Sequence, residues 1–434
     1  MRIFGMLLSM TVALTANCFA SERVLDIQHW NSNGARVYFV AAPQVPILDI
    51  QLAFDAGSGR DGKQFGLAAL TNNLLNEGSG QYSATQIAEQ FEDVGAIFQT
   101  TARRTMAGLS LRTLTQADSL KSALKTFETV LSQARFENKA IERERSQLLS
   151  ALRQSQESPQ QIASNAFFKE LYPSHPYGHP VLGSETTIPK LDTADIQRFY
   201  RHYYSSNNLV IAMVGAIDRA QAEKIAQQLT SRLPRGQSAK ALPAAKPLEK
   251  AISKHIKHPS KQTIIRMGQL GIDRHNSDYF PLLVGNYTLG GGSLVSRLAD
   301  EIREKRGLSY GISSRFSPMP AKGPFIIGLA TKTGQASNAR AVTQDTVERF
   351  VKKGPSTEEL MAAKQYLNGS FPLHFSSNKS IAANLLNMGF YRLPLDYFDT
   401  YLARVNALTT KQIQQAFNKT LTPQKMLTVT VGQA

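Results

Sequence analysis

The spacing of hydrophobic and polar residues predicts that strands and helices alternate in both halves of the chain. Apolar runs bounded by turn residues are typical of buried strands, and they occur at 45–54 (VPILDIQLAF), 208–215 (NLVIAMVG), 263–267 (TIIRM) and 426–432 (MLTVTVG). Helical spacing of apolar residues occupies 120–133, 140–152, 338–351 and 356–367. The predicted fold class is therefore α+β.

The two halves of the chain also resemble each other. The stretch Leu191–Gly215 aligns without a gap with Leu408–Gly432, which lies 217 residues further along the chain. In both copies a helical pattern passes into a β-rich run that ends in Val-Gly. We therefore expect two homologous halves, each a sheet packed with helices, that face each other across a cleft, where ligand sites are common.

A proline-rich and basic segment separates these halves. Residues 232–252 contain three prolines in RLPRGQSAKALPAAKPLEK and no aromatic residue, which indicates an exposed linker. The expected organisation is a signal peptide at 1–20, an N-terminal domain at 21–231, the linker, and a C-terminal domain at 253–434.

The first twenty residues have the pattern of a secretory signal peptide. A basic Arg2 precedes a mostly apolar stretch, and Cys18 and Ala20 place small residues at the −3 and −1 positions of a cleavage site after Ala20. The stretch is too short to span a membrane. Because Asn17 precedes Cys18, we do not expect a lipid anchor there. A periplasmic location follows, and the mature chain has no cysteine for disulfides or thiolate ligands.

Length and charge narrow the function classes further. The chain has 434 residues, with 49 Lys and Arg against 33 Asp and Glu, for a net charge of +16. This length allows two large domains with proper cores and excludes a small disulfide scaffold. The basic residues are spread along the chain without a recognisable nucleic-acid module, so we expect no nucleic-acid partner.

The first informative motif lies at Asp55–Ser79 (DAGSGRDGKQFGLAALTNNLLNEGS). Its pattern predicts a strand end, a Gly-rich turn and an amphipathic helix with leucines 67, 70 and 74 on one face. The stretch resembles the insulinase/pitrilysin family of zinc peptidases, which includes mitochondrial processing peptidase. In that family an AGS-type strand end precedes G-L-A-H-x-x-E-H. Here Ala69, Asn72 and Asn73 replace the first His, the Glu and the second His.

These replacements remove the chemistry of the motif. The two imidazoles of H-x-x-E-H hold zinc and the carboxylate acts as base, whereas alanine has no donor atom and asparagine is not a useful base. The family's third ligand is a Glu on a later helix, which aligns with Ala151 in ERERSQLLSAL. The resemblance therefore implies no metal in this chain, with zinc expected in a partner subunit.

Other histidines do not replace the missing ligands. His175 and His179 belong to HPYGH, whose Pro and Gly indicate a loop without helical i, i+4 geometry. His255 and His258 are expected to precede a strand in a basic segment. We interpret all four as structural.

The second informative motif is Gly290–Tyr310 (GGGSLVSRLADEIREKRGLSY). It predicts a flexible Gly loop, Ser293 as the N-cap, and a helix that Gly307 ends. The apolar stripe of that helix is expected to consist of Leu294, Leu298 and Ile302.

This block resembles the second domain of the same peptidase family, which contains an R-x-x-x-x-x-x-Y pair. Arg303 and Tyr310 match that pair. In the family, the two side chains bind the peptide carbonyl near the zinc of the other domain. Both groups are hydrogen-bond donors that can stabilise a developing oxyanion.

The combination implies one member of a split enzyme. The leading hypothesis is the non-zinc subunit of a periplasmic heterodimeric zinc metallopeptidase, inactive alone, whose partner is a homologous subunit with the zinc motif and whose substrate is a peptide or unfolded polypeptide. The alternative is a catalytically inactive peptide-binding or assembly protein, comparable to the family's core subunits in a respiratory complex. A third possibility, an independent hydrolase, has no Ser/His/Asp or paired-carboxylate pattern to support it.

Overall fold

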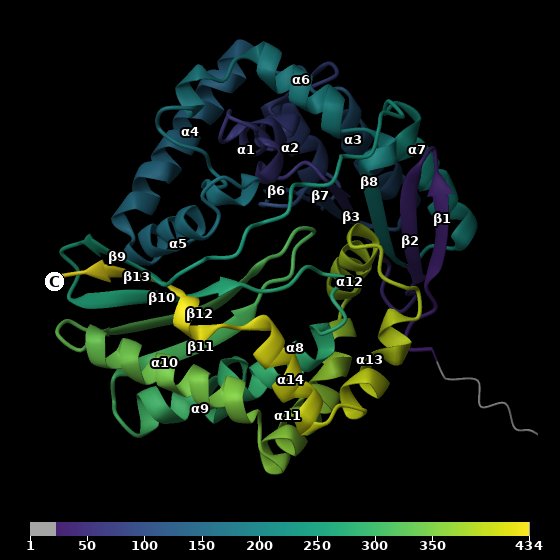
Figure 1. The fold of residues 1–434 in the computed structure, drawn as a ribbon. Coiled ribbons are helices and arrows are strands. Elements are labelled where there is room, and N and C mark those ends of the chain that lie inside the picture. The colour runs from purple at the N-terminus through teal and green to yellow at the C-terminus, as the bar shows by residue number, and fades with distance from the viewer. Residues whose placement is uncertain (1–22, 434) are drawn as a thin grey trace, which may run out of the picture.

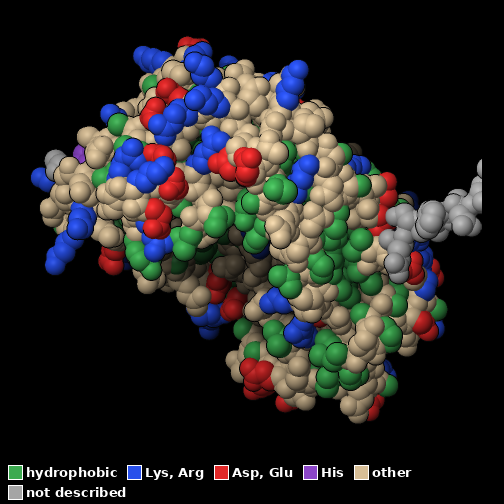
Figure 2. Space-filling model, turned by 90° about the horizontal axis from the view of Figure 1, so that it is seen from below, with side chains coloured by type: hydrophobic (Ala, Val, Ile, Leu, Met, Phe, Trp, Pro, Cys, Tyr) green, Lys and Arg blue, Asp and Glu red, His purple; other side chains and the backbone are tan. Residues whose placement is uncertain are grey.

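The computed structural model describes residues 23–433, and the predicted signal peptide lies outside the described residues. Two sheets, each with its own layer of helices, lie one above the other (Figure 1). Within residues 23–433, no helix is long and apolar enough to cross a membrane. Figure 2 shows that, on the face seen from below, hydrophobic side chains gather beside a hollow, while acidic and basic side chains are interspersed elsewhere.

The sheet of the first half has six strands in the order β1-β2-β8-β3-β7-β6. Strands β2 and β8 are parallel, and the other neighbours are antiparallel. All residues of β8 are buried, because helices cover both faces of the sheet at this strand. The strands are β1 (Gln28–Ser32), β2 (Ala35–Ala41), β3 (Ile47–Phe54), β6 (Ile97–Ala102), β7 (Ala107–Leu114) and β8 (Leu209–Gly215).

The helices of the first half confirm the predicted pattern with one correction. The helical ranges 120–133 and 140–152 fall largely or wholly inside α3 and α4. Helix α1, however, is buried on nearly every side and is not amphipathic. The helices are α1 (Leu67–Asn73), α2 (Ala84–Glu92), α3 (Ala117–Ser132), α4 (Asn138–Glu157), α5 (Pro159–Leu171), α6 (Thr193–Tyr203) and α7 (Arg219–Ser231), and a short hairpin of β4 (Gly78–Ser79) and β5 (Tyr82–Ser83) follows α1.

The sheet of the second half has five strands in the order β11-β12-β10-β13-β9, with only β13 and β9 parallel. The strands are β9 (Ile252–Lys257), β10 (Gln262–Leu270), β11 (Ser309–Phe316), β12 (Pro324–Lys332) and β13 (Leu427–Gly432). The helices are α8 (Tyr279–Asn286), α9 (Arg297–Ala299), α10 (Ala336–Lys353), α11 (Thr357–Ser370), α12 (Asn378–Phe390), α13 (Tyr397–Asn406) and α14 (Thr410–Thr420). The helical patterns at 338–351 and 356–367 correspond to α10 and α11.

The predicted internal repeat is confirmed by matching elements. Helices α6 and α14 have the same length, each begins with a capping box, and each leads into an interior strand of its sheet. Those strands, β8 and β13, each form the parallel pair of their sheet. The two halves are therefore homologous α+β units.

Each half contributes one helix to the sheet of the other half. Helix α5 of the first half packs on β13 and β10, and α12 of the second half packs on β8 and β3 (Figure 1). Phe167 on α5 is buried with Ile264 and Val429 of the second sheet. Residues 232–251 form no helix or strand, yet Ala245 of this segment joins the same cluster. The halves are thus interlocked by burial of apolar surface.

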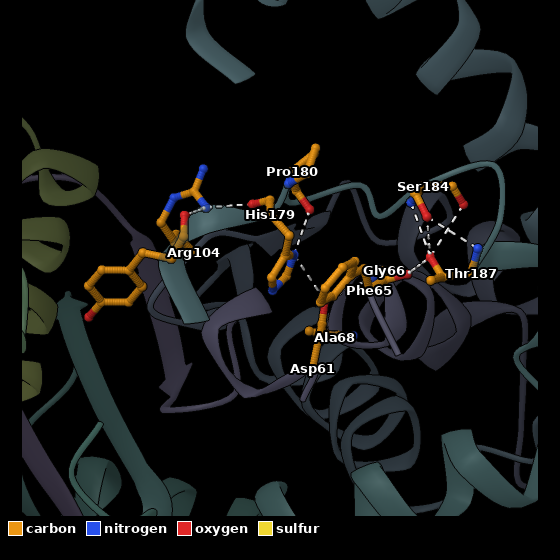
Figure 3. A network of polar contacts seen from close by, with 10 residues as sticks. Asp61, Phe65, Gly66, Ala68, Arg104, His179, Pro180, Ser184 and Thr187 are labelled. Atoms are coloured by element: carbon orange, nitrogen blue, oxygen red, sulfur yellow. Dashed lines mark hydrogen bonds and ion pairs between the residues drawn. The ribbon is translucent and has the colours of Figure 1, made fainter. Parts of the chain in front are cut away.

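The start of α1 is held by the buried side chain of Asp61 (Figure 3). Asp61 accepts hydrogen bonds from the backbone N–H groups of Gly66 and Ala68, both at 2.8 Å. His179 Nδ1 lies 3.9 Å from Asp61 Oδ2, and its ring stacks on Phe65. Burial raises the pKa of Asp61 to about 8 against the effect of its two backbone donors, and burial lowers the pKa of His179.

We expect Phe167→Ala to weaken the connection between the halves. The side chain is 1% exposed, and removing a buried aromatic ring of this kind costs about 3–5 kcal/mol. Urea denaturation measures this loss. As a control, Val295→Ala, where the residue is 75% exposed, should change the free energy of unfolding by less than about 0.5 kcal/mol. Equal effects of the two substitutions would contradict the role given to α5.

The buried carboxyl also predicts a pH dependence of stability. An unfolded Asp titrates near pH 4, so between about pH 4 and 8 the folded chain holds one more proton at Asp61. The free energy of unfolding should therefore fall as pH rises, by up to about 1.4 kcal/mol per pH unit. Urea denaturation at pH 5, 6 and 7 tests this, with Asp61→Asn, which cannot titrate, showing a flatter slope. Parallel slopes would show that Asp61 is ionised when folded.

Candidate functional site

The positions of the missing zinc motif lie on α1 and form part of the buried core. Ala69 is 2% exposed and Asn72 is 0% exposed. The Asn72 Oδ1 atom accepts a hydrogen bond of 2.9 Å from the hydroxyl of Tyr204, whose ring packs against Phe54. Because the Asn72 side chain is used inside the core, it is not available as a base toward a ligand.

A carboxylate that the sequence analysis did not single out lies beside Asn73. Glu144 of α4 is buried, and its pKa is raised by desolvation and by the nearby carboxylate of Glu77, while a hydrogen bond from Asn73 opposes that rise. Glu77 is itself paired with Arg143. The polar run ERERSQ did not indicate that one of its acidic side chains is buried. The one available signal was that Glu144 lies two helical turns before Ala151, the position aligned with the family's third zinc ligand.

These residues do not fit a zinc ion. Ala151 on α4 is exposed and has no donor atom, and zinc in proteins takes three or four nitrogen, sulfur or oxygen ligands. Nowhere in the described part of the chain do three or more His, Cys, Asp or Glu side chains come together. Glu144 and Asn73 alone supply too few donors.

The four histidines have separate structural surroundings. His175 Nε2 lies 2.9 Å from the carbonyl oxygen of Pro243, and His179 belongs to the contacts around Asp61. His258 Nδ1 accepts the backbone N–H of Ser260. His255 lies within β9 rather than before a strand, with Nδ1 at 2.9 Å from the hydroxyl of Thr430.

The second motif differs from its expected local structure at the glycines. Residues Tyr287–Gly291 continue α8 as a π-helical turn instead of forming a flexible loop. Gly290 is buried, and a Cβ there would overlap the Ser314 hydroxyl and the Leu298 side chain. Gly290 is therefore needed for close packing against β11, whereas a Cβ at Gly291 or Gly292 would meet Asn286 or Tyr287 of the preceding helical segment.

The helix of this motif also begins later than predicted. Ser296, not Ser293, is the N-cap, because Ser296 is extended and its hydroxyl accepts the N–H of Ala299, whereas Ser293 has a φ of 52°. Leu294 consequently precedes the helix and is 55% exposed, so it is not part of the apolar stripe. Leu298 and Ile302 are fully buried as expected. Gly307 has a φ of 58° and donates its N–H to the carbonyl of Arg303, which ends the helix.

Arg303 and Tyr310 lie together at the edge of the second sheet. The Cζ atom of Arg303 is 5.1 Å from the centre of the Tyr310 ring, within the range of a cation–π contact. Tyr310 is 89% exposed and belongs to an irregularity of the edge strand β11 between Ser309 and Ile312. The Ser309 hydroxyl accepts the N–H of Gly311 and donates to the carbonyl of Ala330, which ties down this irregular stretch.

This arrangement presents two hydrogen-bond donors outward. Arg303 has one carboxylate nearby, with Nε at 3.5 Å from Glu304 Oε1, a distance that leaves most of its N–H groups unused. The phenol of Tyr310 points into solvent from an edge strand. The pair can bind an oxygen atom of a molecule that approaches the edge of the sheet.

A separate cavity of about 700 Å³ lies between α8, α11, α12 and α13. Its walls carry many aromatic rings, including those of Tyr287, Tyr366 and Phe398, and neither Arg303 nor Tyr310 lines it. It is therefore distinct from the edge of β11.

Comparison with known proteins identifies the family. Residues 36–185 match the family model described as insulinase (peptidase family M16), and residues 190–367 match the model described as peptidase M16 inactive domain. A Helicobacter pylori protein named non-peptidase homolog YmxG is 26% identical over 93% of this chain and 93% of its own.

Solved structures agree with this result. A Pseudomonas fluorescens protein described as a peptidase M16 inactive domain has a TM-score of 0.91 and 39% identity, covering 94% of this chain and 99% of that chain. A chain of complex III from Candida albicans has a TM-score of 0.79 and covers 93% of this chain and 95% of its own, but its 15% identity supports the fold alone. On these matches, the chain belongs to the insulinase family of peptidases, peptidase family M16.

Proposed function

We propose that this chain is the non-zinc subunit of a periplasmic heterodimeric zinc metallopeptidase, in which Arg303 and Tyr310 bind the carbonyl oxygen of the substrate. The observation on which the proposal rests is the outward presentation of this pair by a chain whose α1 holds Ala69, Asn72 and Asn73 at the zinc positions. The names of the relatives, a non-peptidase homologue and an inactive domain, support the absence of activity in the chain alone.

The exposure of the Tyr310 side chain supports a role in binding and not in stabilising the fold. A large aromatic side chain gains stability when it is buried, so a tyrosine that is 89% exposed contributes little to folding. The adjacent guanidinium keeps the ring oriented through the cation–π contact. Both groups donate hydrogen bonds, and such donors stabilise an oxyanion more strongly than a neutral carbonyl.

The partner in this proposal is a homologous subunit with an intact H-x-x-E-H motif. It supplies the zinc and the base, while this chain supplies the two donors and one wall of the substrate chamber. The substrate is a peptide or an unfolded polypeptide segment, because the unpaired edge of β11 can align an extended backbone.

A second function is a binding or assembly protein without any catalytic part. It is favoured by the well-packed interior around Asn72 and Tyr204, and the similarity in fold to a complex III chain is consistent with it. In that case Arg303 and Tyr310 would not affect peptide hydrolysis in any complex.

One experiment separates the two functions. The mature chain is purified, and its zinc content and peptidase activity are measured alone and after addition of the most similar zinc-motif chain from the same organism. The split enzyme requires no zinc and no activity alone, with activity appearing in the mixture above that of the zinc-motif chain. Formation of a complex without any gain in activity would favour the assembly protein.

In the active complex, we expect Arg303→Ala and Tyr310→Phe each to lower kcat by about 10²–10³-fold, the usual effect of losing one oxyanion donor. Arg306→Ala is the matched control, since Arg306 lies on the same segment but is paired with Glu301. Its kcat should stay within about twofold of the original. Equal losses for Arg303 and Arg306, with complex formation unchanged, would contradict the role of the pair.

A further inference from the structure

Part of the inner face of the second sheet is not covered by the other half. Helix α5 packs over β13 and β10, and β12 and β11 lie beyond them in the sheet. A cavity of about 180 Å³ opens at this boundary. Residues of α5, β10, β11 and β12 line it: Ser164, Phe167, Arg266, Ser313, Arg315 and Gly328, together with Ile326.

Two arginines and a serine share the face of the sheet that lines this cavity. Arg266 of β10 pairs in register with Gly328 of β12, and Gly328 pairs with Ser313 of β11. Arg315 follows Ser313 by two residues, so its side chain projects from the same face. The three polar side chains therefore project from β10 and β11 on the same face, on either side of Gly328 in β12.

Gly328 leaves the space that the Arg266 guanidinium occupies. A Cβ at position 328 would overlap Nη1 of Arg266. The guanidinium thus lies across β12 at the one residue without a side chain and extends toward β11. Gly328 is required here for space and not for its backbone conformation, because its φ lies outside the left-handed region.

In the described part of the chain, no carboxylate pairs with either of the two arginines. Arg266 is half-buried, and its pKa is lowered by desolvation and by the charge of Arg315. Within residues 23–433, neither guanidinium forms an ion pair. By contrast, Arg112 on the first sheet binds both carboxylate oxygens of Asp49 at 3.0 Å.

We propose that Arg266, Arg315 and Ser313 form a binding site for a carboxylate of a peptide lying along β11. Two guanidinium groups present planar pairs of N–H donors that match the two oxygens of a carboxylate. The volume of about 180 Å³ suits an acidic side chain or a chain terminus and is small for a nucleotide. The net charge of +16 adds a general attraction for acidic peptides.

The position of the site gives it a role in substrate choice. This role rests on the proposed function. Arg315 lies five residues after Tyr310 on the same strand, which corresponds to roughly 16 Å in an extended chain. A peptide along β11 would thus place an acidic group about five residues from the carbonyl at Tyr310. The substrate class inferred is an extended peptide with an Asp or Glu at that spacing.

Binding to the isolated chain tests this inference without any peptidase activity. The probes are two fluorescein-labelled, C-terminally amidated peptides of about ten residues that differ only in Glu or Gln at one central position. Fluorescence anisotropy at about 50 mM salt measures each Kd. We expect the Glu peptide to bind at least tenfold more tightly, and Arg266→Gln and Arg315→Gln each to reduce that preference to less than threefold.

Glycine substitutions provide a matched pair without a change of charge. Gly328→Ala displaces the Arg266 guanidinium and should reduce the preference, whereas Gly369→Ala on α11, where a Cβ meets nothing within 4 Å, should leave it unchanged. Arg201→Gln on α6, an exposed arginine of the other half, controls for net charge. Thermal denaturation confirms that each variant is folded.

The outcomes of this binding test can be distinguished from the outcomes of the peptidase test of the proposed function. An equal Kd for the Glu and Gln peptides, or a preference that persists in both arginine variants, would overturn the site. If inorganic phosphate displaces the Glu peptide at phosphate concentrations near the Kd of the peptide, the site binds free anions. That result would overturn the assignment to peptides. A preference lost only in the arginine and Gly328 variants would support the site even if no zinc-bearing partner restores hydrolysis.

Discussion

The contribution of one helix from each half to the sheet of the other half is the constraint on which the remaining structure depends. Helices α5 and α12 bury apolar side chains against the opposite sheets, so neither half completes its core alone. This arrangement fixes the position of α1 in the first half relative to β11 in the second half. It also determines where the inner face of the second sheet is covered and where it remains open beside β11.

The interior of the first half shows how the residues at the zinc-motif positions are accommodated in the core. Asn72 bonds to the hydroxyl of Tyr204 inside the core, and Asp61 holds the first backbone N–H groups of α1. The motif positions have therefore become part of the packing, since a buried polar group is tolerated when it is hydrogen-bonded. The outward groups of the second half, Arg303 and Tyr310, have no such role in the core, which is why we assign them to binding.

Much of the architecture was predictable because it depends on local periodicity. The buried strand at 47–54, the helices α3, α4, α10 and α11, and the repeat that pairs α6 with α14 all follow from the spacing of apolar residues. The predictions that were wrong concern residues whose environment is set at long range. Gly290 and Gly291 continue a helix, and Gly290 packs against β11, which no local pattern indicates; Leu294 is exposed because the helix begins only after Ser296.

The sequence by itself determined the α+β class, the two homologous halves, the replacement of the H-x-x-E-H residues by Ala69, Asn72 and Asn73, and the spacing of Arg303 and Tyr310. The fold class follows from the local spacing of apolar residues, the two halves from matching segments 217 residues apart, and the two motifs from residue identity at a short spacing. Only the tertiary structure decided that Glu144 is buried near Asn73, that Tyr310 is exposed, and that Arg266 and Arg315 meet across a glycine. The reason is that these environments arise from strands and helices far apart in the chain, and burial and charge balance exist only once those elements have packed.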